Sequence, residues 1–415
     1  MASKTAACFF LALALLFTLS IAGQPAQNHQ AHGNNSKGPL KLVGVIAIPG
    51  NPILSSDIAW IDSGTKRFYL SDRSNFGIDI IDAENNLFVG RVIGFAGPGN
   101  STPPPPNGQG PNGVLVTPSK KVWAGDGNST VQVADVDTGS PNYLKIIKSI
   151  STAIPECGPH CDRADEIGYD DADHLILVAN NQPLTANSTN PPTRSNPYAS
   201  FISADTYQVL GHVSFEGATG LEQPLWVPEL HRLFITVPGY RNKGGSNGGN
   251  GEIAVIDPKS MKVEKTLKPG DCHASGEALG PSHHVLVTCG GPVVLNASDG
   301  TIISRITQIG GGDEDWYNAG DGRFYFTAED KSTSVDSLGA VDAQSGMWLQ
   351  NVPDPGGRQA VALADNNHVF TPVRATPATV KDPSSDNSTC AQFGFKGTGC
   401  IAVFAHSADR TNQQK

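Results

Sequence analysis

The feature that most restricts the fold of this chain is a unit that repeats seven times between residues 40 and 407. In each unit one polar residue precedes a short apolar segment, and neighbouring polar residues lie 38 to 57 positions apart. We call these residues the column: Asp57, Asn112, Asp165, Glu222, Ser275, Asp313 and Arg358. A repeat of this length, built of short strands and turns, is typical of a β-propeller blade.

Each unit continues with an alternating strand such as RFYLSD from Arg67, a short apolar pair with a turn residue such as Asp82, and a further strand. Six units contain four such segments, but the seventh ends near Phe404. The segment from Leu40 resembles the fourth strands, so we predict that it completes the last blade and closes the ring. The predicted fold is therefore all-β, a seven-bladed β-propeller of four-stranded blades. A β-sandwich would not explain seven aligned positions.

The N-terminus predicts export. Lys4 precedes an apolar run over residues 6–19 and small residues at 20–22, which is the pattern of a signal peptide. We predict a signal peptide at 1–22, a disordered segment at 23–39, the propeller at 40–407 and a flexible tail at 408–415. No later segment has the roughly 18 apolar residues that span a bilayer. We therefore expect a secreted, extracellular protein.

Cysteines and sequons agree with export. After removal of Cys8 with the signal, six cysteines fall into the local pairs Cys157–Cys161, Cys272–Cys289 and Cys390–Cys400, which we expect to form disulfides. A zinc site is the alternative, but one C-x3-C without a histidine pair gives it little support. In a eukaryotic source the chain would be a glycoprotein, with sequons at Asn34, Asn100, Asn128, Asn187, Asn296 and Asn387.

The charge balance excludes some partners. Lys and Arg number 29 against 39 Asp and Glu, which gives a formal net charge of -10. The basic residues form no cluster, so we expect neither nucleic acid nor an anionic membrane surface as a partner. We expect a monomer.

The long connecting segments are predicted to gather at one face. Turns between first and second strands, and between third and fourth strands, are only a few residues long. The long segments, such as residues 94–111 and 376–399, all belong to the two other connection types. In an up-and-down blade these lie on the face where the first strand begins, so they surround the channel mouth that carries the column.

The column offers oxygen ligands for a divalent cation such as Ca²⁺, from Asp57, Asn112, Asp165, Glu222 and Asp313. The candidate catalytic residues are Asp165, Glu222, Asp313 and Arg358. One of these carboxylates would act as a general acid or base. Arg358 would either neutralise the ring or hold a substrate carboxylate. The alternative interpretation is that the column faces water or ties the blades together.

Two family resemblances follow from these segments. RFYLSDRSNFGIDIIDAENN resembles the YVTN-type β-propeller repeat, and the likeness covers residues 40–404. The polar mouth is also similar to the gluconolactonase/senescence-marker-protein group, although those propellers have six blades. That similarity implies a divalent ion that polarises a lactone carbonyl or activates water, and the matching residue types here are Glu222, Asn112 and Asp313.

Two main hypotheses for function result. The first is a secreted, divalent-metal-assisted lactone or ester hydrolase. The second is a non-catalytic extracellular binding module for a glycan or protein partner. Either would take a small-molecule or glycan ligand at the channel mouth. A lyase that acts on acidic sugars, with Arg358 on the carboxylate, is a third alternative with less support.

Overall fold

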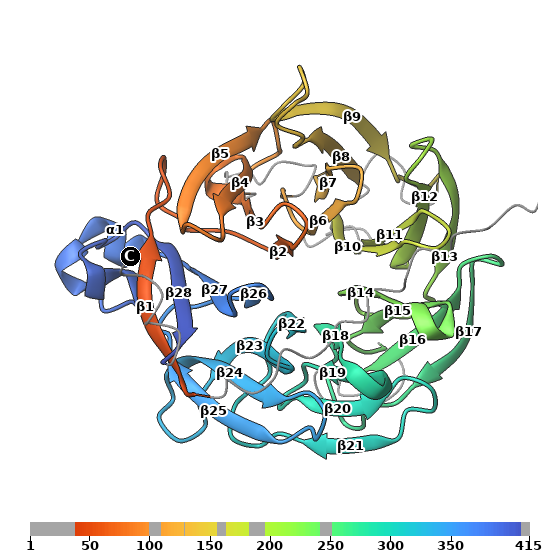
Figure 1. The fold of residues 1–415 in the computed structure, drawn as a ribbon. Helices are drawn as coiled ribbons and strands as arrows, with labels where there is room; N and C mark the ends of the chain where they lie inside the picture. Colours follow the sequence, from red (N-terminus) through yellow and green to blue (C-terminus); the bar gives the residue numbers. More distant parts are fainter. Residues whose placement is uncertain are drawn as a thin grey trace, which may run out of the picture. The chain divides into compact units, whose positions relative to one another are not determined.

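The computed structural model describes residues 38–98, 109–127, 129–155, 163–181, 196–240 and 251–407. They form seven four-stranded antiparallel sheets, which are the blades of a ring (Figure 1). The predicted all-β seven-bladed propeller is thereby confirmed. The predicted signal peptide (1–22), most of the predicted disordered segment (23–39) and the predicted tail (408–415) lie outside the described residues.

Strands are lettered A to D from the channel outward, and blades are numbered by their A strand. The A strands are β2 (Ala59–Asp62), β6 (Val114–Thr117), β10 (Ala164–Asp170), β14 (Pro224–Val227), β18 (Glu277–Leu279), β22 (Asp315–Asn318) and β26 (Val361–Leu363). The B strands are β3 (Arg67–Asp72), β7 (Lys121–Asp126), β11 (Leu175–Asn180), β15 (Arg232–Val237), β19 (His284–Val287), β23 (Arg323–Glu329) and β27 (His368–Val373). The C strands are β4 (Gly77–Asp82), β8 (Thr130–Asp135), β12 (Tyr198–Ser203), β16 (Glu252–Asp257), β20 (Val293–Asn296), β24 (Asp336–Asp342) and β28 (Cys400–His406). The D strands are β5 (Leu87–Ile93), β9 (Lys145–Ser151), β13 (Val209–Ser214), β17 (Lys262–Leu267), β21 (Ile302–Arg305), β25 (Trp348–Pro353) and β1 (Leu40–Ile46).

The ring closes as the sequence predicted. Strand β1 is the outer strand of the last blade, and it pairs with β28 from Leu40 opposite His406 to Ile46 opposite Ile401. His406 is fully buried, and its Nε2 lies 2.9 Å from Asp321 Oδ2 of the preceding blade. Its Nδ1 lies 2.7 Å from the carbonyl oxygen of Gly38. Side-chain contacts therefore reinforce the backbone pairing that joins the two ends of the ring.

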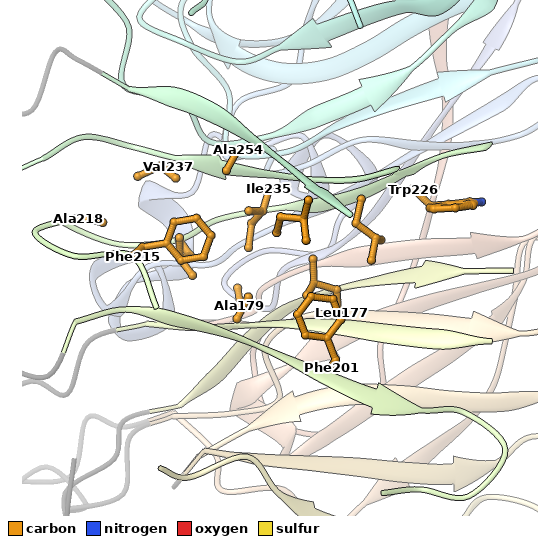
Figure 2. Close-up of a cluster of buried hydrophobic side chains, with 13 residues drawn as sticks. Leu177, Ala179, Phe201, Phe215, Ala218, Trp226, Ile235, Val237 and Ala254 are labelled. Atoms are coloured by element: carbon orange, nitrogen blue, oxygen red, sulfur yellow. The ribbon is translucent and has the colours of Figure 1, made fainter. Parts of the chain in front are cut away.

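The hydrophobic core lies between adjacent blades. In Figure 2, Leu177 and Phe201 of blade 3 pack against Trp226 and Ile235 of blade 4. Middle strands such as β11 are buried on both faces because each blade is covered on both sides, whereas the side chains of outer strands such as β5 are mostly exposed or partly buried. Side chains packed to this density hold the inner strands in fixed positions around the channel.

Two of the three predicted disulfides are confirmed, Cys272–Cys289 and Cys390–Cys400. The third predicted pair, Cys157–Cys161, lies outside the described residues. The second disulfide stabilises the connection between β27 and β28, which contains the helix α1 (Pro377–Lys381). Within the part of the chain that the structure describes, no helix has both the length and the apolar character to cross a membrane.

Candidate functional site

The seven column residues occupy equivalent positions at the start of the blades' inner strands: six precede the A strand, and Asp165 is the second residue of β10. In five blades the column N–H donates to a carbonyl oxygen at the end of strand B. These pairs are Asp57–Ser71, Asn112–Gly125, Glu222–Thr236, Ser275–Thr288 and Arg358–Pro372, at 2.8 to 3.1 Å. In the other two blades the equivalence is seen in the strand pairing. The residue two positions after the column pairs with strand B, as Ala59 does with Leu70 in blade 1: Ile167 pairs with Val178, and Asp315 pairs with Phe326. The column residues identified from the sequence therefore take the same place in all seven blades.

Arg73 joins two column residues. Its Nη2 lies 2.5 Å from Asp57 Oδ2 and 2.6 Å from Asn112 Oδ1, and its Nε also donates to Asn112 Oδ1 at 3.1 Å. Arg73 is only 6% exposed. The guanidinium therefore neutralises one buried carboxylate and links blade 1 to blade 2.

The other predicted site residues have separate partners. Asp165 lies 2.7 Å from Arg163 and also accepts a hydrogen bond from Asn181. Asp313 is exposed and accepts from Gln359 Nε2 at 3.1 Å. Glu222 is partly exposed.

Arg358 lines one surface pocket together with Asp313 and Arg374, but its ion pair is with Asp336. Its Nη1 is 3.8 Å from Asp336 Oδ2, and its side chain is 45% exposed. Arg73 and Arg163 make the ion pairs with the column carboxylates Asp57 and Asp165.

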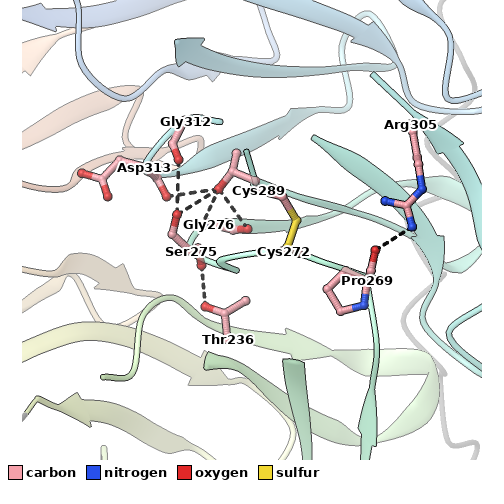
Figure 3. The surroundings of a disulfide bond; sticks show 10 residues. Thr236, Pro269, Cys272, Ser275, Gly276, Cys289, Arg305, Gly312 and Asp313 are labelled. Carbon is pink, nitrogen blue, oxygen red and sulfur yellow. Dashed lines mark hydrogen bonds between the residues drawn. A yellow bond between two sulfur atoms is a disulfide. The ribbon is translucent and has the colours of Figure 1, made fainter. Parts of the chain in front are cut away.

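Hydrogen bonds at this level run around the whole ring. Each of the seven blade interfaces has one near the column, and Figure 3 shows two of them, Thr236 to Ser275 and Ser275 to Gly312. The full set is Arg374–Ser56, Arg73–Asn112, Asn112–Ala164, Asn181–Leu221, Thr236–Ser275, Ser275–Gly312 and Gln359–Asp313. Three column residues, Asn112, Ser275 and Asp313, thus make hydrogen bonds between blades, which agrees with the alternative interpretation at those positions.

The column carboxylates nevertheless interact across the mouth. Burial raises the pKa of Asp57 to about 6; Arg73 acts in the opposite direction, and repulsion from Asp165 and Asp313 adds to the rise. Although part of the Glu222 side chain reaches the surface, desolvation within the mouth raises the pKa of its carboxyl group well above the usual range, again with repulsion from Asp165 and Asp313. The structure therefore brings the four predicted carboxylates into one electrostatic group.

The predicted cation ligands are not arranged as a preformed metal site. The oxygens of Asp57 and Asn112 both accept hydrogen bonds from Arg73, and Asp165 is paired with Arg163. Across the described ranges, no group of three or more His, Cys, Asp and Glu side chains is placed to hold a metal ion. Because Asp57, Asn112 and Asp165 already have cationic or amide partners, these three residues do not fit the divalent ion that the family resemblance implies.

Sequence reasoning missed a second set of polar residues at the mouth. Arg73, Asn181 and Arg374 each follow directly after a B strand, in blades 1, 3 and 7. Arg73 and Asn181 bind column residues, and Arg374 donates to the Ser56 side chain at 3.0 Å. Alignment of the repeats on the last residue of strand B, rather than on the column, would have detected them.

Deeper in the channel lies a cavity of about 420 Å³. Its walls come from the inner strand region of all seven blades, and none of the column residues is among them. Carboxylates from the next two positions line it instead, namely Glu166, Glu314, Glu277 and Asp315. The predicted column is therefore adjacent to the cavity, but the cavity begins one residue further along the A strands.

The cavity carboxylates are buried. Glu277 and Asp315 are 0% and 2% exposed, and within the described part of the chain neither oxygen of either side chain has a hydrogen-bond partner. Burial raises the pKa of both groups well above the usual range, and Asp315 adds repulsion at Glu277. Unpartnered buried carboxylates of this kind are rare in proteins and are commonest at functional sites.

These features define the class of the protein as a seven-bladed β-propeller with an acidic central channel. Comparisons with family models and with curated proteins find no match to the chain. The narrower assignments to YVTN-type or gluconolactonase-like propellers stay predictions.

Proposed function

We propose that this protein is a binding module that takes a small-molecule ligand in its central channel. The observation that carries the proposal is the cavity, whose volume of about 420 Å³ falls in the usual range of roughly 300–1,000 Å³ for such sites. It combines apolar walls with a few buried polar groups, which is the usual composition of a ligand site. Of the two sequence hypotheses, the proposal favours the binding module and moves the ligand from the mouth into the channel.

A thermal-shift screen tests this proposal. A compound set that spans neutral, anionic and cationic small molecules should contain stabilising ligands, with a gain of about 2.7 kcal/mol at a concentration of 100 Kd. Leu279 lines the cavity, so Leu279→Trp should abolish the gain by filling it. Leu210 is 46% exposed on β13, so the matched control Leu210→Trp should retain the gain. A set in which no compound stabilises the protein would refute the proposal.

Hydrolysis is a second candidate function, favoured by the electrostatics of the mouth. A carboxyl group whose pKa is about 6, as at Asp57, is suited to proton transfer near neutral pH. We expect any turnover of a lactone or ester panel to fall by about 100-fold or more in Asp57→Asn, and to rise with pH through about 6 in the unmodified protein. The assay is run with chelator and with added Ca²⁺. Absence of turnover in both conditions would remove this candidate.

Secretion and membership of the YVTN-type repeat proteins also belong to the proposal. The two disulfides support secretion, because such bonds persist mainly in oxidising compartments. The regular four-stranded blades support the repeat family.

A further inference from the structure

The cavity has one aromatic and apolar part. Trp60 and Trp316 face each other edge to face, with ring centroids 5.1 Å apart, and both line the cavity together with Trp226. Leu225 and Val361 contribute aliphatic surface to the same walls. Such walls favour the hydrocarbon body of a ligand, and the faces of tryptophan rings also attract cations.

The cavity also has an acidic part, whose carboxyl groups have no hydrogen-bond partner among the described residues. Glu277 of β18 and Asp315 of β22 belong to adjacent blades and repel each other. A Cβ atom at Gly276 would collide with Asp315 Oδ1, so the Asp315 carboxylate lies against the residue that precedes Glu277. Two buried carboxylates therefore lie close together, and all four of their oxygens lack hydrogen-bond donors from the described residues.

The chemistry of these two parts selects a class of ligand. A buried carboxylate without a donor is unfavourable, and an ammonium group supplies both the charge and up to three N–H donors. A divalent ion is not favoured, because no group of three or more His, Cys, Asp and Glu side chains among the described residues is placed to hold one. A carboxylate or phosphate ligand would supply no N–H donor, and either carboxyl group would repel it in the ionised form.

We propose that the cavity binds an organic ammonium ion, with its charged head between Glu277 and Asp315 and its hydrocarbon body against Trp60, Trp226 and Trp316. This inference rests on the proposed function and names the ligand class of the same site. Gln223 Oε1 accepts from the backbone N–H of Glu277 at 2.8 Å, which fixes the strand that carries this carboxylate. The carboxylates are thus held in place before the ligand arrives, which favours affinity.

Isothermal titration with three probes of similar shape tests the inference. The probes are 2-phenylethylammonium, neutral 2-phenylethanol and anionic 3-phenylpropanoate. We expect the ammonium ion to bind at least about 10-fold more tightly than the alcohol, and the carboxylate to bind most weakly. The substitutions Glu277→Gln and Asp315→Asn should each weaken ammonium binding by about 10- to 100-fold and leave alcohol binding nearly unchanged.

The control and the contrary outcomes separate the inference from the proposed function. Glu264→Gln changes an exposed carboxylate on β17 and should not alter any of the three affinities. If the ammonium ion and the alcohol bind equally, or if ammonium affinity persists in both channel variants, the ammonium assignment is wrong and small-molecule binding stands. If no probe binds, the ammonium assignment fails, and the broader compound screen decides whether the proposed function fails with it.

Discussion

Replacing Arg73 by methionine is expected to lower the free energy of unfolding by about 3–5 kcal/mol. The change removes the guanidinium but keeps most of the aliphatic bulk. Asp57 would then be a buried carboxylate without its cation, and Asn112 Oδ1 would lose two hydrogen bonds. Breaking a buried pair by removal of one partner is costly because the other charge remains out of water. Equilibrium unfolding in urea measures the loss.

A matched control distinguishes burial from the mere loss of an arginine. Arg232 pairs with Glu264 at the surface, with side-chain exposures of 29% and 42%, so Arg232→Met should lower stability by less than about 1 kcal/mol. Adding Asp57→Asn to Arg73→Met should recover about 1–3 kcal/mol, because the unpaired charge is gone. A loss below about 1 kcal/mol in Arg73→Met would show that the contacts of Arg73 with Asp57 and Asn112 do not stabilise the ring.

The fold was predictable because its main determinant is local and repeated. Every unit carries an alternating apolar B strand, and the six units with a C–D turn begin that turn with a small polar residue such as Asp82, whose Oδ1 accepts from the Glu84 and Asn85 N–H groups. Closure was predictable for the same reason, since the segment from Leu40 has the pattern of a D strand and the seventh unit lacks one. Two disulfides followed from the short spacing within each pair.

The site was only partly predictable. The column is a real structural position, but a sequence does not show how far along the channel a side chain lies. Column residues therefore looked like the binding site, whereas the cavity is lined from the next two positions, at Glu166 and Glu277 for example. The partners of the column were also hidden, because Arg73 and Asn112 are 39 residues apart and meet only across a blade interface.

Polar side chains differ in their partners along the channel. At the mouth, the polar side chains have partners in neighbouring blades, as with Arg73 and Asn112. In the cavity, Glu277 and Asp315 have none, so their burial opposes folding. Proteins retain such unfavourable groups mainly where a ligand uses them. The inner carboxylates, rather than the column, are therefore the better place to look for binding.

The stability of the protein is expected to fall as pH rises above about 4.5, and Glu277→Gln should weaken this dependence. Burial raises the pKa of Glu277 well above its ordinary value of 4.5, and repulsion from Asp315 makes a smaller contribution in the same direction. Between these two pKa values the folded state holds a proton that the unfolded state has released. Folding then takes up a proton, so the free energy of unfolding decreases with pH by up to about 1.4 kcal/mol per unit for this group.

Urea unfolding at pH 5, 6, 7 and 8 tests the slope rather than the absolute stability. This choice matters because a buried glutamine also lacks partners and lowers stability equally at every pH. The slope for Glu277→Gln should be shallower than that of the unmodified protein by up to about 1.4 kcal/mol per pH unit. Glu264→Gln, at an exposed side chain, should leave the slope unchanged. Parallel slopes for Glu277→Gln and the unmodified protein would mean that Glu277 is ionised in the folded state. A cation or solvent inside the channel would then already accompany it.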